Sequence, residues 1–142
     1  MNLFIVGNDP DIPAISRRVA ERSGFMAVDM AALLAERMGG PPAAFAAQKG
    51  SQTLAEMESH VLGSVARRSG CIVAVGRQIE LTPANIFQMK ERGLILWLKN
   101  AADDRQASDP LSAFKQAADY VLDMDGKSPD QKAEAVWNLL WE

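Results

Sequence analysis

Short apolar runs alternate with amphipathic stretches along the chain. The apolar runs are rich in β-branched or aromatic residues, as buried strands are, and they occupy residues 2–6, 26–28, 71–75, 94–98 and 120–123. Helical spacing of apolar positions predicts helices between them, over residues 12–23, 30–38, 53–68 and 83–92, and a last helix that begins at residues 128–129. Strands that alternate with helices predict an α/β fold, with a parallel sheet covered by helices on both faces.

Two of the predicted helices begin with strong capping signals. Thr82 is followed by Pro83, and Ser128 is followed by Pro129, so each helix has a hydroxyl side chain at its N-cap and a proline at its first position. Gly93 ends the first of these two helices. The boundaries of both helices are therefore set by local chemistry as well as by apolar spacing.

Composition narrows the class of protein. The 142 residues suffice for a single domain over 1–142, and 48% hydrophobic residues are ordinary for a globular chain. The net charge is −3 without a basic block, so nucleic acid is not expected as a partner. No apolar run is long enough to cross a bilayer and no signal peptide is recognisable, so a cytoplasmic protein without membrane attachment is expected. One cysteine, Cys71, and one histidine, His60, exclude an internal disulfide and a structural zinc site.

The segment "GNDPDIPAIS", residues 7–16, joins the first predicted strand to the first predicted helix. A glycine at such a junction is where many α/β proteins bind phosphate, because the backbone N–H groups at a helix start attract anions. This segment carries two aspartates and two prolines and has no lysine. The position therefore suggests a phosphate-binding loop, whereas the residue types do not.

The order of motifs resembles the shikimate kinase family of P-loop kinases over nearly the whole chain. The similar segments are "NLFIVG", "RRVAERSGFMAVDM", "LAEMESHVL", "GCIVAVG", "NIFQMKERGLILWL" and "AFKQAADYVLDMDGKSP". Ala118-Asp119, followed by Asp123, Asp125 and Gly126, is the most specific match. The resemblance implies a three-layer α/β/α fold with a five-stranded parallel sheet in the order 2-3-1-4-5. It also implies a kinase that uses Mg-ATP to convert shikimate to shikimate 3-phosphate in aromatic amino acid biosynthesis.

The nucleotide-binding positions depart from the family pattern. Only Gly7 remains from the P-loop, while the lysine position falls at or near Ile12 and the hydroxyl position near Pro13 or Ala14. Pro10 and Pro13 lack a backbone donor. Two carboxylates are expected where a triphosphate would lie, those of Asp9 and Asp11. By resemblance this loop is a degenerate P-loop.

The substrate-side positions also differ. Asp29 matches the aspartate that assists magnesium, but Ala31 replaces the one that would deprotonate the substrate hydroxyl. The arginine that clamps the substrate carboxylate falls at Ala55, whereas Glu58 matches the glutamate that follows. The family's glycine triplet, a remnant of the substrate pocket, is here Gly76, Arg77 and Gln78. The lid, with its catalytic arginine, is expected between Leu98 and Asp119, in a segment shorter than the family's, where Arg105 is the only arginine.

The leading interpretation is a shikimate kinase-like pseudoenzyme with a binding or regulatory role and no cofactor. It has no assigned catalytic residue, since Asp29 and Glu58 are remnants and Asp29 is only a weak metal ligand. A protein partner, such as another enzyme of aromatic biosynthesis, or a second copy of the chain would fit this role. Two alternatives stay open. One is a phosphotransferase or other small-molecule enzyme with a site rebuilt from Asp29, Glu58 and Arg77, and the other is a binding module for an anion at Arg77.

Several single residues receive structural expectations. Asp11 is expected to cap the first helix with its carboxylate, and Asp29 to act as a turn or cap. Arg77 is expected to fill the former pocket, with an anion-binding role as the second interpretation. Trp137 and Trp141 are expected to dock the last helix on the sheet, although an exposed Trp141 would anchor a partner. Cys71 is expected to be buried, and His60 to lie on the surface.

Overall fold

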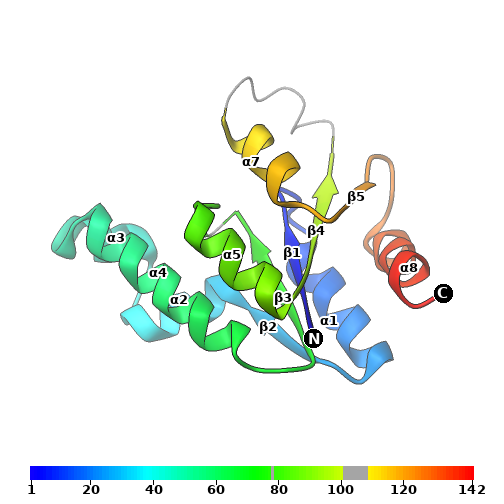
Figure 1. Ribbon diagram of the computed structural model, residues 1–142, viewed down its shortest axis with the longest axis horizontal. Coiled ribbons are helices and arrows are strands. Elements are labelled where there is room, and N and C mark those ends of the chain that lie inside the picture. Colours follow the sequence, from blue (N-terminus) through cyan, green and yellow to red (C-terminus); the bar gives the residue numbers. More distant parts are fainter. Residues whose placement is uncertain (78, 101–108) are drawn as a thin grey trace.

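The computed structural model describes residues 1–77, 79–100 and 109–142. Its centre is a five-stranded parallel sheet in the order β2-β3-β1-β4-β5 (Figure 1). The strands are β1 (Asn2–Val6), β2 (Met26–Asp29), β3 (Cys71–Gly76), β4 (Gly93–Lys99) and β5 (Tyr120–Asp123). The sequence-based fold class and the strand order are both confirmed.

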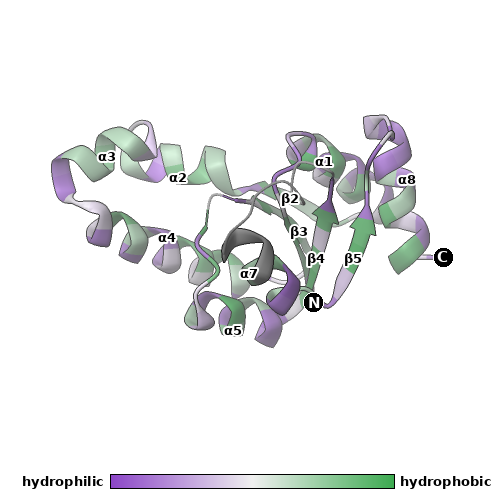
Figure 2. Cartoon of the chain, turned by 90° about the horizontal axis from the view of Figure 1, so that it is seen from above, coloured by the Kyte–Doolittle hydropathy of each residue, from purple (hydrophilic) through white to green (hydrophobic). Residues whose placement is uncertain are grey.

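Helices cover both faces of this sheet. They are α1 (Ile12–Ser23), α2 (Met30–Met38), α3 (Pro42–Lys49), α4 (Ser51–Ala66), α5 (Pro83–Arg92), α7 (Asp109–Ala117) and α8 (Pro129–Leu140). Seen from above, α1 and α8 lie on one side of the sheet and α5 and α7 on the other (Figure 2). Of the described helices, none is long and apolar enough to cross a membrane.

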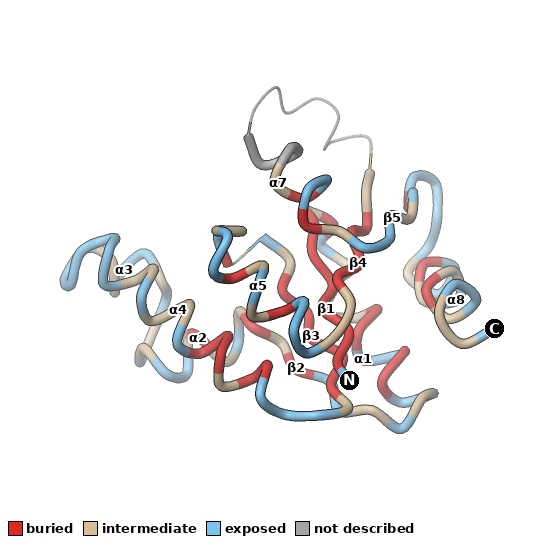
Figure 3. The backbone as a smooth tube through the Cα atoms, in the orientation of Figure 1, coloured by how far each residue is buried: buried red, intermediate tan, exposed pale blue. Residues whose placement is uncertain are grey.

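The alternation of side chains along each strand divides the core into two clusters. On β1, Phe4 and Val6 pack into the cluster that includes side chains of α2, α4, α5 and α7. Leu3 and Ile5 point the other way, into the cluster with α1 and α8. Both faces of β1 are thus buried (Figure 3). This is why its apolar residues follow one another without a break from Leu3 to Val6 and do not alternate with polar ones.

Neither α3 nor α7 was predicted from the pattern of apolar positions. Two glycines and two prolines follow α2 at positions 39–42, yet Pro42 begins α3, because proline is tolerated in a first helical turn. No residue of α3 is buried, and the helix lies at the end of the projection formed with α2 and α4 (Figure 1). An amphipathic signal was therefore absent there. Of the predicted lid segment, residues 101–108, which include Arg105, lie outside the described residues.

The C-terminal helix α8 is docked by half-buried aromatic residues. The rings of Trp137 and Trp141 stack with their centroids 5.1 Å apart, and Trp141 meets Phe25 edge-on at 5.8 Å. Arg22 of α1 lies 4.2 Å from the centroid of the Trp137 ring. The expected docking role is confirmed, although the contacts are with α1 and the chain before β2 rather than the sheet alone. Cys71 is buried and His60 exposed, as predicted.

Candidate functional site

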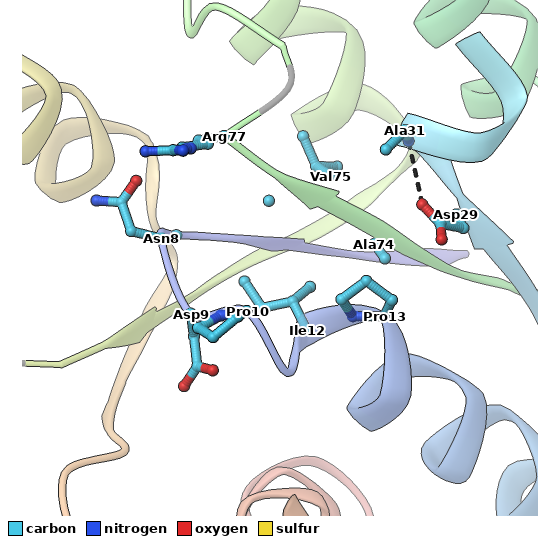
Figure 4. Close-up of a pocket in the computed structure, with 12 residues that line it drawn as sticks. Asn8, Asp9, Pro10, Ile12, Pro13, Asp29, Ala31, Ala74, Val75 and Arg77 are labelled. Carbon is cyan, nitrogen blue, oxygen red and sulfur yellow. Dashed lines mark hydrogen bonds between the residues drawn. The ribbon is translucent and has the colours of Figure 1, made fainter. Parts of the chain in front are cut away.

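A cavity of about 340 Å³ opens at the carboxyl ends of β1 and β3, beside the N-termini of α1 and α2 (Figure 4). This end of a parallel sheet is where α/β proteins place their ligands. The lining residues come from three segments, and they are Gly7, Asn8, Asp9, Pro10, Ile12, Pro13, Asp29, Ala31, Ala74, Val75, Gly76 and Arg77. The cavity therefore lies where the sequence places the remnant loop and the remnant substrate pocket.

Gly7 is required by close packing. Its φ is +132°, and a Cβ at this position would lie 2.7 Å from the carbonyl oxygen of Leu98 and 3.2 Å from the ring of Trp97. Its N–H donates to the carbonyl oxygen of Gly76 at 3.1 Å, which ties the end of β1 to the end of β3. Gly7 thus has a structural role in this chain.

The loop uses its backbone donors internally. Besides the N–H of Gly7, the N–H of Asp11 donates to Oδ1 of Asp9 at 2.9 Å, and the N–H of Ile12 donates to the backbone oxygen of Asp9 at 3.3 Å. Pro10 and Pro13 have no N–H. Five of the seven positions from 7 to 13 therefore offer no unused backbone donor to an anion.

The two aspartates of the loop do not lie as the sequence suggested. Asp9 is only 4% exposed, and its carboxylate points away from the other side chains of the cavity (Figure 4). Lys132 of α8 forms ion pairs with both acids, 2.8 Å from Oδ2 of Asp9 and 2.9 Å from Oδ2 of Asp11. The charge of the two carboxylates is thus compensated from α8 and is not directed into the cavity.

The expectation that Asp11 caps α1 is wrong. Asp11 occupies the N-cap position, but its backbone is helical, with φ −84° and ψ −3°, and its side chain accepts no hydrogen bond from the helix. A capping side chain needs an extended backbone to reach back to the first N–H groups. The carboxylate instead turns to Lys132, and Asp9 accepts the N–H of Asp11.

Lys132 is the residue that sequence reasoning missed. It is 9% exposed, and burial on its own lowers the pKa of its ammonium group, but hydrogen bonds and charge from Asp9 and Asp11 outweigh this and raise it above the ordinary value. A signal did exist in the sequence. Lys132 lies four residues before Val136, which is fully buried, so a charged residue stands on the apolar stripe of α8.

Asp29 acts as the N-cap of α2, as predicted. Its Oδ1 accepts the N–H groups of Ala31 at 3.1 Å and Ala32 at 3.4 Å, and its backbone is extended. The same carboxylate lines the cavity. No group of three acidic, histidine or cysteine side chains that would hold a metal ion exists among the residues that the structure describes.

Replacing Asp29 with alanine should lower the free energy of unfolding by about 1 kcal/mol, because two N–H groups of α2 lose their acceptor. Urea denaturation followed by circular dichroism measures this loss. Asp29→Asn is the matched control, because it keeps a side-chain oxygen for capping and should lose only a fraction as much. Equal losses in the two variants would contradict the capping role.

Arg77 follows Gly76 at the end of β3 and lines the cavity. The expectation that it fills the former pocket is wrong, because its side chain is exposed and the cavity persists beside it. The side chains of Arg77 and Asn8 lie on the same side of the cavity (Figure 4). No ion pair joins Arg77 to an acid in the described part of the chain. Gln78 lies outside the described residues.

Glu58 does not belong to this cavity. It lies on α4, half-buried, and is absent from the lining. Burial, and to a lesser extent the charge of Glu80, raise the pKa of its carboxyl group. Of the three residues named for a rebuilt enzyme site, Asp29 and Arg77 line the cavity, whereas Glu58 does not.

A parallel sheet in this order, with a cavity at the loop between β1 and α1, defines an α/β protein of the P-loop kinase type. The family model for shikimate kinase matches residues 14–109, and the chain belongs to the shikimate kinase family. A shikimate kinase of Dehalococcoides mccartyi is 30% identical over 94 residues, which are 66% of this chain and 53% of that protein. The chain thus spans about half of that relative's length. A shikimate kinase of Caldanaerobacter subterraneus is 23% identical, over a match that covers 86% of this chain and 85% of that protein.

Solved structures give the same fold. The shikimate kinase of Acinetobacter baumannii in complex with shikimate superposes with a TM-score of 0.84 at 17% identity, over 98% of this chain and 92% of that chain. The shikimate kinase of Aquifex aeolicus gives 0.79 at 14% identity, over the full length of both chains. At these identities the likeness establishes the fold, and the chemistry of the site has to be argued from the residues of this chain.

Proposed function

We propose that this member of the shikimate kinase family does not transfer a phosphoryl group from ATP and instead binds a small anionic ligand in its cavity. The observation that carries the proposal is the internal use of the backbone donors between positions 7 and 13. A P-loop holds nucleotide phosphates with those same N–H groups. Once they are donated within the loop or replaced by proline, a triphosphate meets no cradle.

The side chains support the same conclusion for Mg-ATP. In the family, a lysine and a hydroxyl complete the nucleotide site, and the positions that resemble them carry Ile12 and Pro13 or Ala14. A charged hydrogen bond contributes about 1.5–3 kcal/mol. Lys132, which contacts the loop, is already paired with two carboxylates, and Oδ1 of Asp29 accepts two N–H groups of α2. The residues present do not fit a magnesium-bound nucleotide.

The preference for an anion follows from Arg77. Among the described residues that line the cavity, Arg77 is the one with a cationic side chain, and no ion pair to a described acid occupies it. A planar guanidinium binds carboxylate or oxyanion groups through two parallel hydrogen bonds. Ile12, Pro13 and Val75 add apolar surface to the lining of the cavity, which favours a small ligand with a carbon skeleton over a bare ion. The role of the chain would then be to bind a ligand or to regulate another protein, and a protein partner is part of this proposal.

Thermal unfolding in the presence of sulfate, shikimate, ADP and Mg-ATP tests the proposal, because a bound ligand raises the melting temperature according to its concentration relative to Kd. We expect a stabilisation by sulfate or shikimate and none by Mg-ATP. Stabilisation by Mg-ATP would contradict the proposal, and so would the absence of any effect from the anions.

The Arg77→Gln variant should bind the anion at least about tenfold more weakly, which corresponds to the loss of one charged hydrogen bond. Titration calorimetry measures the change in Kd. Arg92→Gln is the matched control, since Arg92 is an exposed arginine in the last turn of α5 and is absent from the cavity lining. Because sulfate also stabilises proteins without a specific site, the difference between the two variants carries the result.

A phosphotransferase with a rebuilt site is the second candidate function. It is favoured by one observation, that Asp29 and Arg77 line the same cavity. An acid and a guanidinium at one site are components of phosphoryl-transfer chemistry. An assay of turnover with Mg-ATP and shikimate distinguishes this candidate from the first.

A further inference from the structure

We propose that Lys132 is a positioning residue, which holds the carboxylates of Asp9 and Asp11 outside the cavity so that an anionic ligand meets Arg77 without a competing negative charge. The consequence for the ligand rests on the proposed function. The positioning of the two carboxylates does not depend on that function, because it can be measured in the absence of any ligand.

The geometry of the loop carries the first step. Each oxygen of the Asp9 carboxylate is assigned a different task, since Oδ1 accepts the N–H of Asp11 at 2.9 Å and Oδ2 pairs with Lys132 at 2.8 Å. The carboxylate points toward the side of the loop opposite the other lining side chains (Figure 4). Lys132 thus completes a turn that lines the cavity, while the negative charges of the turn face α8.

Helix α8 is held firmly enough to define where Lys132 lies. Arg22 of α1 pairs with Glu134 at 2.7 Å and also covers the ring of Trp137. A second pair joins Arg18 to Asp130. Exposed pairs of this kind contribute about 0–1 kcal/mol each, so α8 keeps its position when one of them is removed. Such a pair offers a control that leaves the loop untouched.

Loss of the lysine charge leaves two carboxylates close together at one turn. An unpaired buried carboxylate is costly, and like charges in proximity repel each other. The cavity is open to solvent and Arg77 lies in it, so rotation of Asp9 toward the cavity relieves both costs. In that orientation Asp9 competes with an anionic ligand for the same cation.

The N–H of Asp11 reports where the Asp9 carboxylate points, and it does so without any ligand. In Lys132→Gln we expect the Asp11 amide proton to move upfield in the NMR spectrum and to exchange faster with water, because its acceptor has turned away. In Arg18→Gln, the matched control on the same helix interface, the resonance should stay in place. An unchanged Asp11 resonance in folded Lys132→Gln would overturn the positioning role.

Sulfate binding tests the consequence. We expect Lys132→Gln to bind sulfate at least about tenfold more weakly than the parent, and Arg18→Gln to bind it equally well. The double variant Lys132→Met with Asp9→Asn removes both charges of the buried pair, so it should fold and bind sulfate within about threefold of the parent. It stands in for the single variant if that one does not fold.

The outcomes separate the two proposals. A parent chain that binds neither sulfate nor shikimate defeats the proposed function, while the Asp11 resonance still decides the positioning role. A parent that binds, together with Lys132→Gln that binds equally well, overturns the inference. Loss of sulfate binding in the double variant also overturns it, because Lys132 would then contact the anion directly.

Discussion

Incubated with Mg-ATP and shikimate, the purified chain should form shikimate 3-phosphate at least about 10³-fold more slowly than the 1–100 s⁻¹ that is typical of kinases. Phosphoryl transfer depends on positioning and on stabilisation of charge, and a single arginine that contacts the transferred group is worth about 10³–10⁵ in rate. Here five of the seven positions from 7 to 13 offer no unused backbone donor, and Lys132 is occupied by Asp9 and Asp11.

A coupled assay of ADP release, with product formation confirmed by mass spectrometry, measures this rate. The shikimate kinase of Dehalococcoides mccartyi, 30% identical over the matched segment, is the positive control under the same conditions. Turnover of this chain within the ordinary kinase range would defeat the proposed function and favour the rebuilt phosphotransferase. Arg77→Gln would then show whether the cavity is the site of that activity.

The Lys132→Met variant should lose about 3–5 kcal/mol of unfolding free energy, the cost of leaving a buried charge without its partner. Asp9 is 4% exposed, so its carboxylate would lie buried without a counter-charge. The loss should be smaller in Lys132→Arg, which retains a cation. Urea denaturation monitored by circular dichroism measures both variants.

The control for this loss is Arg18→Met, which removes an exposed pair between α1 and α8 and should cost about 0–1 kcal/mol. Equal losses in Lys132→Met and Arg18→Met would contradict the role of the buried pair. Because the folded-state pKa of Lys132 is raised above its ordinary value of 10.5, its contribution is complete below that pH. The contribution is lost as the pH rises through the folded-state pKa. The unfolding free energies of the parent chain and of Lys132→Met should therefore converge in strongly alkaline solution.

The fold was largely predictable because it depends on repeated, local signals. Each of the five strands carries its own apolar run, and the helices from Pro83 and Pro129 carry their own caps. The strand order came from resemblance, since alternation alone permits other orders. Helix α3 was not predicted because none of its residues is buried. A helix without a buried face does not need the periodic apolar residues by which helices are recognised in a sequence.

The site was predictable in place but not in detail. A glycine after the first strand located the cavity, and Asp29 behaved as its position before α2 suggested. The role of Asp11 could not be predicted from its neighbours, because the direction of its side chain is decided by Lys132, which lies 121 residues later. Local sequence favoured a cap, and a distant cation provided a stronger interaction.

The same separation in sequence has a consequence for synthesis on the ribosome. Asp9 and Asp11 emerge early, and the cation that neutralises them is translated 121 residues after Asp11. At roughly 5–20 residues per second, the delay is about 6–24 s. During this interval β1 and α1 can pair with later elements, but the turn between them carries two uncompensated negative charges. The turn therefore reaches its final conformation only when α8 docks, so this edge of the cavity is completed after the elements from β1 to β5 have been translated.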